Sequence, residues 1–200
     1  MAQTDIKRLF AYSSIGQVGY VVLGLGLGTP LGIVGALYHL VNHAAFKSLL
    51  FLNAGAVEYA TGTRDLDKLG GLNRALPVSG GTSLIASMSI AGIPPLNGFW
   101  SKLIIILAAV EAGFVGFAIV AALVSIVTLA YQLKVQRGAF FTASPTTSMA
   151  WRQEPRSMAI AMILLSIACL ALSLLVIGGL HDPFFIGPAV DTLLAGPFAP

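Results

Sequence analysis

Five long apolar runs restrict the fold of this chain more than any other feature. They cover roughly residues 11–28, 32–59, 78–112, 114–134 and 157–179. About 20 apolar residues in a helix cross the ~30 Å hydrocarbon layer of a membrane. Charged residues make up 10% of the chain and the mean hydropathy is +0.88. Soluble domains carry about 25% charged residues, so the sequence predicts an all-α, polytopic bundle of transmembrane helices.

The basic character of the chain does not indicate nucleic-acid binding. Although the pI is near 9.2, the basic residues lie mostly in short loops between apolar runs, as membrane topology requires. Cys169 is the only cysteine and lies in an apolar run, so it cannot form an internal disulfide. Residues 1–8 are polar and lead into an apolar helix without a cleavage pattern, so we expect no signal peptide.

The third apolar run contains a break. Residues 78–112 are too long for one straight span, and Pro94-Pro95-Leu96-Asn97-Gly98 interrupts them. The two prolines lack backbone donors and disfavour a continuous helix. The run therefore forms either two separate spans or one broken span. The second run of 28 residues would be about 42 Å long as a helix, so we expect it to tilt or to protrude.

Charge placement favours one broken span. In that arrangement the N-terminus and the loops 60–77 and 135–156 share one side of the membrane. That side holds nine of the eleven basic residues: Lys7, Arg8, Arg64, Lys68, Arg74, Lys134, Arg137, Arg152 and Arg156. The opposite side holds Glu111, His181, Asp182 and Asp191 and no lysine or arginine. The positive-inside rule then predicts five spans and a cytoplasmic N-terminus. The tail, with Pro183, Pro188, Pro197 and Pro200, would be irregular and outside.

The second run carries a row of titratable side chains. His39, His43 and Lys47 are spaced by four residues, so they share one face of a helix. Glu58 lies about three turns further on, near the same stripe. Histidine titrates near neutral pH, so the row predicts a proton relay. Two alternatives remain: the lysine extends to the interface while the histidines bond carbonyls, or the His-x3-His pair binds zinc. The zinc site is disfavoured because no cysteine is close by.

Lys47 and Lys102 are the two basic residues inside apolar runs. Ionisable residues inside a membrane are costly and are functional by default. Lys102 follows the break directly, and broken membrane helices expose backbone groups that only protein or water can satisfy. We therefore expect Lys102 at the end of a water-filled path. Polar rows in two other runs either hold water or bond between helices; they are Ser13, Ser14, Gln17 and Tyr20, and Ser125, Thr128, Tyr131 and Gln132.

Five segments in order resemble those of one membrane-protein family. They are Asp5-Ile6-Lys7-Arg8-Leu9 with Ala11 to Tyr20, His39 to Lys47, Asp65-Leu66 with Leu69 to Leu72, Gly92-Ile93-Pro94-Pro95, and Gly98-Phe99-Trp100-Ser101-Lys102. Over about residues 3–138 the chain resembles the antiporter-like subunits of complex I (NADH–quinone oxidoreductase), of multisubunit cation/proton antiporters and of membrane-bound hydrogenases.

The resemblance implies roles for individual residues. His39, His43 and Lys47 would belong to a central hydrophilic axis that carries protons, and Lys102 would link this axis to the far side of the membrane. Gln17 stands where some members have a histidine. Such subunits consist of two inverted five-helix repeats, and the chain matches only the second. We therefore expect it to be the C-terminal part of such a subunit, with another chain supplying the first repeat.

These observations predict three regions and a function. Residues 1–138 would form the second-repeat transmembrane domain, 139–156 a cytoplasmic loop, and 157–200 a last helix with a short tail. The chain would translocate protons, or exchange Na⁺ for H⁺, as part of a respiratory NADH–quinone oxidoreductase, an Mrp-type antiporter or a membrane-bound hydrogenase in a bacterial or archaeal cytoplasmic membrane. Alternatively it would be a non-conducting structural remnant. We expect no catalysis by the chain alone and no bound redox cofactor.

Overall fold

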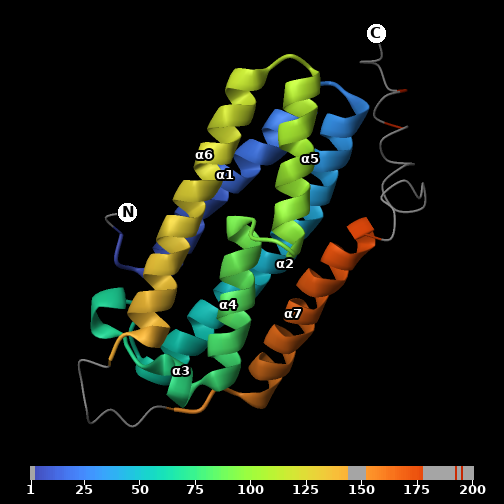
Figure 1. Ribbon diagram of the computed structural model, residues 1–200. Coiled ribbons are helices and arrows are strands. Elements are labelled where there is room, and N and C mark those ends of the chain that lie inside the picture. Colours follow the sequence, from blue (N-terminus) through green and yellow to red (C-terminus); the bar gives the residue numbers. More distant parts are fainter. Residues whose placement is uncertain (1–2, 144–151, 178–191, 193–194, 196–200) are drawn as a thin grey trace.

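The computed structural model describes residues 3–143, 152–177, 192 and 195. Helices form nearly all of this part, with one isolated bridge between Asp5 and Asp65. The elements are α1 (Ile6–Gly26), α2 (Pro30–Thr61), the 3-10 turn η1 (Leu66–Lys68), α3 (Leu72–Ala75), α4 (Pro77–Ala91), α5 (Asn97–Glu111), α6 (Val115–Val135), the π-helical turn η2 (Gln136–Phe141) and α7 (Arg156–Ile177). The prediction of an all-α helical membrane bundle is confirmed (Figure 1).

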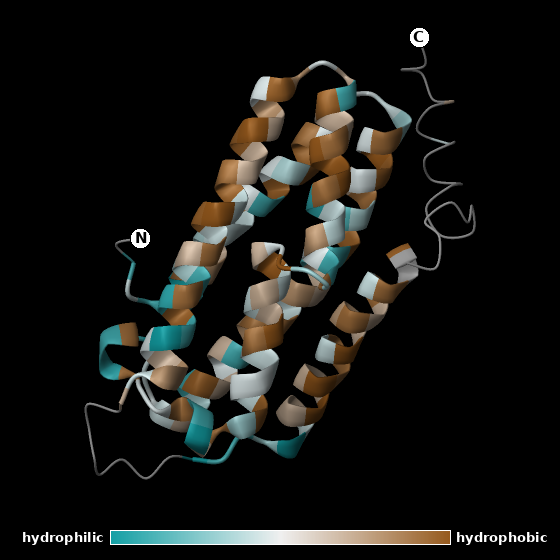
Figure 2. Ribbon diagram, in the orientation of Figure 1, coloured by the Kyte–Doolittle hydropathy of each residue, from teal (hydrophilic) through white to brown (hydrophobic). Residues whose placement is uncertain are grey.

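Apolar side chains cover the outer surface of the bundle. Three helical stretches of the described chain are long and apolar enough to cross a membrane: Ile6–Gly26, Val115–Phe141 and Arg156–Leu174. Ile15 on α1, Ile126 on α6 and Leu174 on α7 are each more than 60% exposed. Figure 2 shows hydrophobic residues along the outside of these helices. Soluble proteins rarely expose apolar surface on this scale, so the outer face is suited to lipid.

Capping residues set the ends of the first two helices. The Asp5 side chain accepts a hydrogen bond from the Arg8 backbone N–H at 3.0 Å, and such a cap starts a helix. Helix α1 therefore begins within the polar segment, five residues before the predicted apolar run. Helix α2 follows the Thr29 cap and ends at Gly62, whose φ of 72° only glycine adopts without strain.

Helix α2 is the element around which the others pack. It has 32 residues, so it is about 48 Å long, and it contacts α1, α4, α5 and α7. Figure 1 shows it running obliquely through the bundle from one end to the other, which accommodates its length by tilt. Phe46, Leu49, Leu50 and Val57 on α2 are fully buried. These residues belong to the main hydrophobic core. Their packing fixes the position of α2 along the axis of the bundle.

The break in the third run falls where the prolines predict it. Helix α4 ends at Ala91, Gly92 turns the chain with a φ of 79°, and α5 begins at Asn97. In Figure 1, α4 occupies the lower half of the bundle and α5 the upper half. Each has 15 residues and is about 22 Å long, which is less than the hydrocarbon thickness. The two halves follow one another along the bundle axis.

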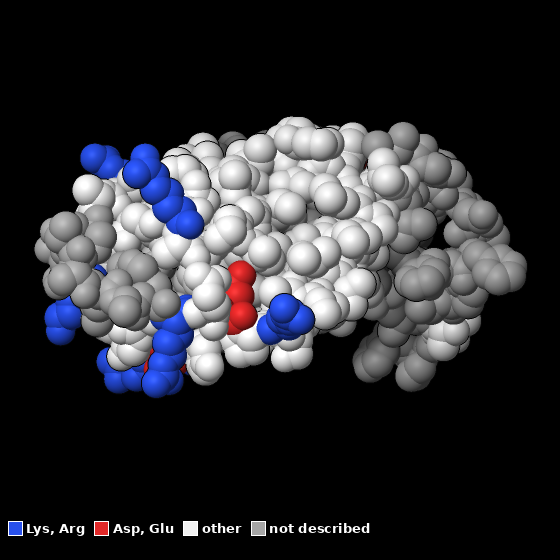
Figure 3. Space-filling view, turned by 90° about the horizontal axis from the view of Figure 1, so that it is seen from below, with Lys and Arg blue, Asp and Glu red and all other residues white. Residues whose placement is uncertain are grey.

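The loop between α2 and α4 is more ordered than the sequence predicted. The short helices η1 and α3 fill it, and Leu72 and Leu76 bury their side chains completely. Lysine and arginine side chains gather at this end of the molecule (Figure 3). Residues 139–141 also continue the helical turn η2 where a loop was expected. The predicted irregular tail, with Pro183, Pro188, Pro197 and Pro200, lies outside the described residues.

The contact between Gly98 and the end of α4 provides a test of the break. A Cβ atom at Gly98 would meet the Ser89 carbonyl group, with 2.9 Å to its carbon. Gly98→Ala should therefore push α5 away from α4 and destabilise the protein by about 1–3 kcal/mol, as overpacking does. The measurement is thermal unfolding of the detergent-solubilised chain. Gly19→Ala is the matched control, because nothing lies within 4 Å of its Cβ position; equal melting temperatures for both variants would contradict the close contact.

Candidate functional site

His39 lies where α2 passes the break between α4 and α5. Its ring is completely buried, and Nδ1 lies 2.8 Å from the Ser101 hydroxyl on α5. Its Nε2 atom has no hydrogen-bond partner among the described residues. The bond at one nitrogen orients the ring, and the other nitrogen remains available to exchange a proton.

His43 and Lys47 continue the row along α2. The His43 ring packs edge-on against Phe46 at 5.6 Å, and its buried Nε2 has no partner within the described chain. Lys47 is 7% exposed. Its ammonium group donates to the Phe10 carbonyl and, at 2.6 Å, to the Ser13 hydroxyl. Both partners belong to α1, so Lys47 points across the helix interface and does not extend to the membrane surface.

The Lys102 side chain bonds to the backbone at the break between α4 and α5. It is 2% exposed, and its ammonium group donates to the Ile90 carbonyl at 2.7 Å. In a continuous helix this carbonyl would accept from residue 94, but Pro94 has no N–H. The lysine therefore replaces the missing backbone donor. The Tyr20 ring lies 5.0 Å from the same ammonium group, within cation–π distance.

A pair of asparagines connects α2 to the start of α5. The Asn97 amide donates to the Asn42 side-chain oxygen at 3.1 Å, and the Asn42 amide donates to the backbone carbonyl of Asn97 at 3.2 Å. Both residues are completely buried. Neither was predicted from the sequence, although an asparagine between two histidines in an apolar run was the available signal. Their bonds hold the break against the face of α2 that carries His39.

The supporting residues divide between two places. Ser13 contacts Lys47, and Gln17 is buried with neither amide atom paired among the described residues. Tyr131 of α6 faces Ser13 and Gln17. Glu58 instead lies at the basic end of the bundle, in ion pairs with Lys7 at 2.5 Å and Arg64 at 3.5 Å. The structure therefore joins Ser13 to the row through Lys47, places Gln17 beside Tyr131, and places Glu58 in a charged cluster near the surface.

The described residues contain no group of three His, Cys, Asp or Glu side chains that could hold a metal ion. His39 bonds to Ser101 instead. The titratable basic side chains that the structure places on α2 and beside the break are His39, His43, Lys47 and Lys102. His39, His43 and Lys47 share one face of α2, so a positive charge on one of them would disfavour a positive charge on its neighbour.

Comparison with known proteins identifies the family of this arrangement. The family model described as "NADH:quinone oxidoreductase/Mrp antiporter, TM" matches residues 1–128. The chain belongs to this family. The resemblance of the five segments is thereby confirmed, and the membrane character of the chain with it. Members of the family whose structures match are subunits of multisubunit membrane complexes.

Three similar proteins show the breadth of the family. A Na(+)/H(+) antiporter subunit of Alkalihalophilus pseudofirmus is 39% identical over 92% of this chain and 36% of its own length. An NADH-quinone oxidoreductase subunit of Desulforudis audaxviator is 39% identical over 72% of this chain and 29% of its own. A chain of respiratory complex I from Thermus thermophilus superposes with a TM-score of 0.80 at 28% identity, over 98% of this chain and 41% of that chain. The chain spans about a third of the length of these curated relatives.

The asparagine pair gives a prediction about how the site is held together. Asn42→Ala and Asn97→Ala should each lower the thermal stability of the solubilised chain, because each leaves a buried amide unpaired. Since the two side chains bond each other, the double variant should lose less than the sum, with a coupling of about 0.5–3 kcal/mol. Additive losses in this double-mutant cycle would mean that the bond between the two side chains does not form in the membrane.

Proposed function

We propose that the chain is an ion-translocating part of a multisubunit membrane complex and moves protons, or exchanges Na⁺ for H⁺, through Lys102, His39, His43 and Lys47. One observation carries this proposal. Lys47 and Lys102 are buried among neutral oxygen atoms, and the ion pairs of the described residues include neither of them. A buried lysine without a counter-charge is costly in a membrane. We propose that the two lysines are kept despite this cost because they exchange protons with His39 and His43.

The proposed mechanism uses the coupling between neighbours. A proton arriving at one end of the row raises the energy of a proton on the next member. The unpaired Nε2 atoms of His39 and His43 are the positions that exchange protons, through bound water. Hydrogen bonds from Lys102 to Ile90 and from Lys47 to Ser13 hold the two ammonium groups in place. A charge change in a neighbouring subunit would then drive protons along the row.

We further propose that the described chain crosses the membrane five times, with α4 and α5 forming one broken crossing. The basic residues around η1 and α3 then lie on the cytoplasmic side with the N-terminus, by the positive-inside rule. The gathering of lysine and arginine at one end of the bundle supports this orientation (Figure 3). A bacterial or archaeal cytoplasmic membrane is the proposed location.

A second chain with the family's first repeat is the proposed partner. Structures that match the chain are parts of multisubunit membrane complexes, and this supports a membrane partner. A mild-detergent pull-down of the tagged chain from native membranes, followed by mass spectrometry, tests it. Recovery of a second antiporter-like chain with oxidoreductase, hydrogenase or cation-antiporter subunits is expected. Recovery of the chain alone would favour a non-conducting structural protein.

Lys102→Met should abolish transport without preventing assembly. Removing a proton-transferring group typically costs a factor of about 10²–10⁴, so we expect at least about a hundredfold loss of proton movement in membrane vesicles. Lys47→Met should act in the same direction. Lys7→Met, in the ion-pair cluster at the basic end, is the matched control and should transport normally. An assembled Lys102→Met complex with wild-type transport would overturn the relay.

Single cysteines should report the proposed orientation. In a Cys169→Ala background, a membrane-impermeant maleimide should label Asp67→Cys only from the cytoplasmic side and Phe114→Cys only from the opposite side. Asp67 is exposed at the basic end, and Phe114 is 50% exposed in the connection between α5 and α6. Labelling of both cysteines from the same side would mean that the broken helix does not complete a crossing.

A further inference from the structure

A second group of buried polar side chains lies between α4 and α6. Ser83 and Ser87 on α4, with Gln132 and Gln136 at the end of α6, form what we name the α4–α6 polar cluster. The Gln136 amide donates to both serine hydroxyls at 2.8 Å, and Ser87 donates to the Gln132 oxygen at 3.4 Å. All four residues are at most 2% exposed. The predicted relay uses none of these bonds.

The hydrogen bonding of this cluster is incomplete. Gln132 Nε2 and Gln136 Oε1 are buried and have no partner among the described residues. Reversing either amide exchanges the unpaired atom and still leaves one atom unpaired. An unpaired buried polar group costs about 1–3 kcal/mol, and proteins normally satisfy such groups with ordered water. The two glutamines therefore point to bound water between α4 and α6.

The Ser87 end of the cluster lies close to the backbone group that binds Lys102. Ser83, Ser87 and Ile90 are spaced by four and three residues, so they lie on one face of α4. The Ile90 carbonyl is the acceptor of the Lys102 ammonium group at 2.7 Å. Water held by Ser87 and Gln132 is thus one helical turn from the lysine. This direction differs from that of the His39–His43–Lys47 row, which follows α2.

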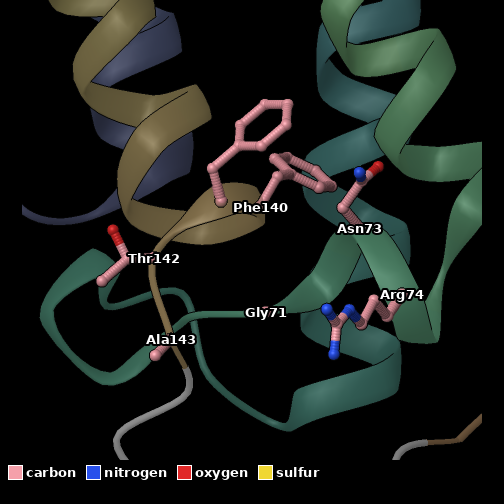
Figure 4. Close-up of a pocket in the computed structure, with 7 residues that line it drawn as sticks. Gly71, Asn73, Arg74, Phe140, Thr142 and Ala143 are labelled. Carbon is pink, nitrogen blue, oxygen red and sulfur yellow. The ribbon is translucent and has the colours of Figure 1, made fainter.

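The lower end of the cluster leads to the basic end of the bundle. Gln136 is the first residue of the π-helical turn, and Phe140 follows within the same turn. Phe140 lines a pocket of about 520 Å³ together with Gly71, Asn73 and Arg74. Figure 4 shows Phe140 on the η2 side of this pocket and Asn73 and Arg74 on the α3 side. π-helical turns often occur at functional sites because they change which side chains face a neighbour.

We propose that the α4–α6 polar cluster binds a row of water molecules that connects Lys102, past Phe140, to the pocket at the basic end. Protons would reach or leave Lys102 through this water from the side that carries the lysines and arginines. The inference rests on the proposed function of Lys102 and adds a second route to it. The competing interpretation is a dry polar contact that only joins α4 to α6.

Cysteine reactivity distinguishes a wet cluster from a dry one. In vesicles containing the assembled complex, with Cys169→Ala, we would compare Ser87→Cys with Leu84→Cys on the lipid-facing side of α4, where Leu84 is 41% exposed. The reagent is 2-(trimethylammonium)ethyl methanethiosulfonate, whose permanent charge keeps it on the side of addition. It reacts with the thiolate, a form that a water-free apolar surrounding suppresses. Labelling is measured by mass spectrometry in vesicles of both orientations, and Ser83→Cys serves as a second reporter.

We expect Ser87→Cys to react at least about tenfold faster than Leu84→Cys when the reagent is added at the basic end. Phe140→Ala should raise this rate further, because Phe140 lines the pocket and belongs to the same helical turn as Gln136. Two outcomes would overturn the proposal: assembled Ser87→Cys and Ser83→Cys that are unreactive from both sides, or reaction only from the side opposite the basic residues.

A transport measurement separates this inference from the proposed function. Gln136→Met keeps the length of the side chain and removes its polar atoms, so proton movement should fall at least about tenfold, the lower range for a lost proton-transfer step. Leu133→Met on the exposed face of α6 is the matched control and should transport normally. If Lys102→Met abolishes transport and assembled Gln136→Met retains it, the water route is wrong and the relay stands. If both retain wild-type transport, both proposals fail.

Discussion

The hydrogen bond between the Lys102 ammonium group and the Ile90 carbonyl is the interaction on which the site depends. Pro94 cannot donate to this carbonyl, and an unpaired carbonyl inside a membrane costs several kcal/mol. Lys102, in the first turns of α5, supplies the missing donor: its ammonium group donates to the Ile90 carbonyl at 2.7 Å. The break thus holds a positive charge in the interior of the bundle, and the charge in turn stabilises the break. Each feature therefore stabilises the other, and the bonds from Asn42 and Ser101 add to the stability of the break.

Helix α2 places a row of titratable side chains, His39, His43 and Lys47, beside the break. Its length lets one rigid element contact α1, α4, α5 and α7, and its i, i+4 spacing aligns His39, His43 and Lys47. Asn42 and Ser101 attach the break to this face through bonds of 2.8–3.2 Å. Side chains that exchange protons must keep fixed positions, and a buried helix with interlocking polar contacts provides them.

Two buried polar systems therefore meet near Lys102. One follows α2 to Lys47 and α1, and the other follows α4 towards Gln136 and the basic end. Each contains buried polar atoms that no described residue satisfies, and in an apolar bundle such atoms indicate where water binds. On both proposals, Lys102 would receive a proton from one path and release it to the other. The ion pairs of Glu58 lie at the surface of the bundle and join α1 and the loop after α2 to the end of α2.

The sequence by itself determined the membrane class, the position of the helices, the break at Pro94-Pro95 and the alignment of His39, His43 and Lys47. These features depend on local chemistry: apolar length, the missing proline donor and the period of a helix. Only the tertiary structure decided that Lys102 bonds to Ile90, that Lys47 bonds to α1, that Glu58 belongs to an ion-pair cluster and that Gln132 and Gln136 meet Ser87. Each of these contacts joins different elements of the fold. Helical periodicity fixes which face a residue occupies but not which helix packs against that face.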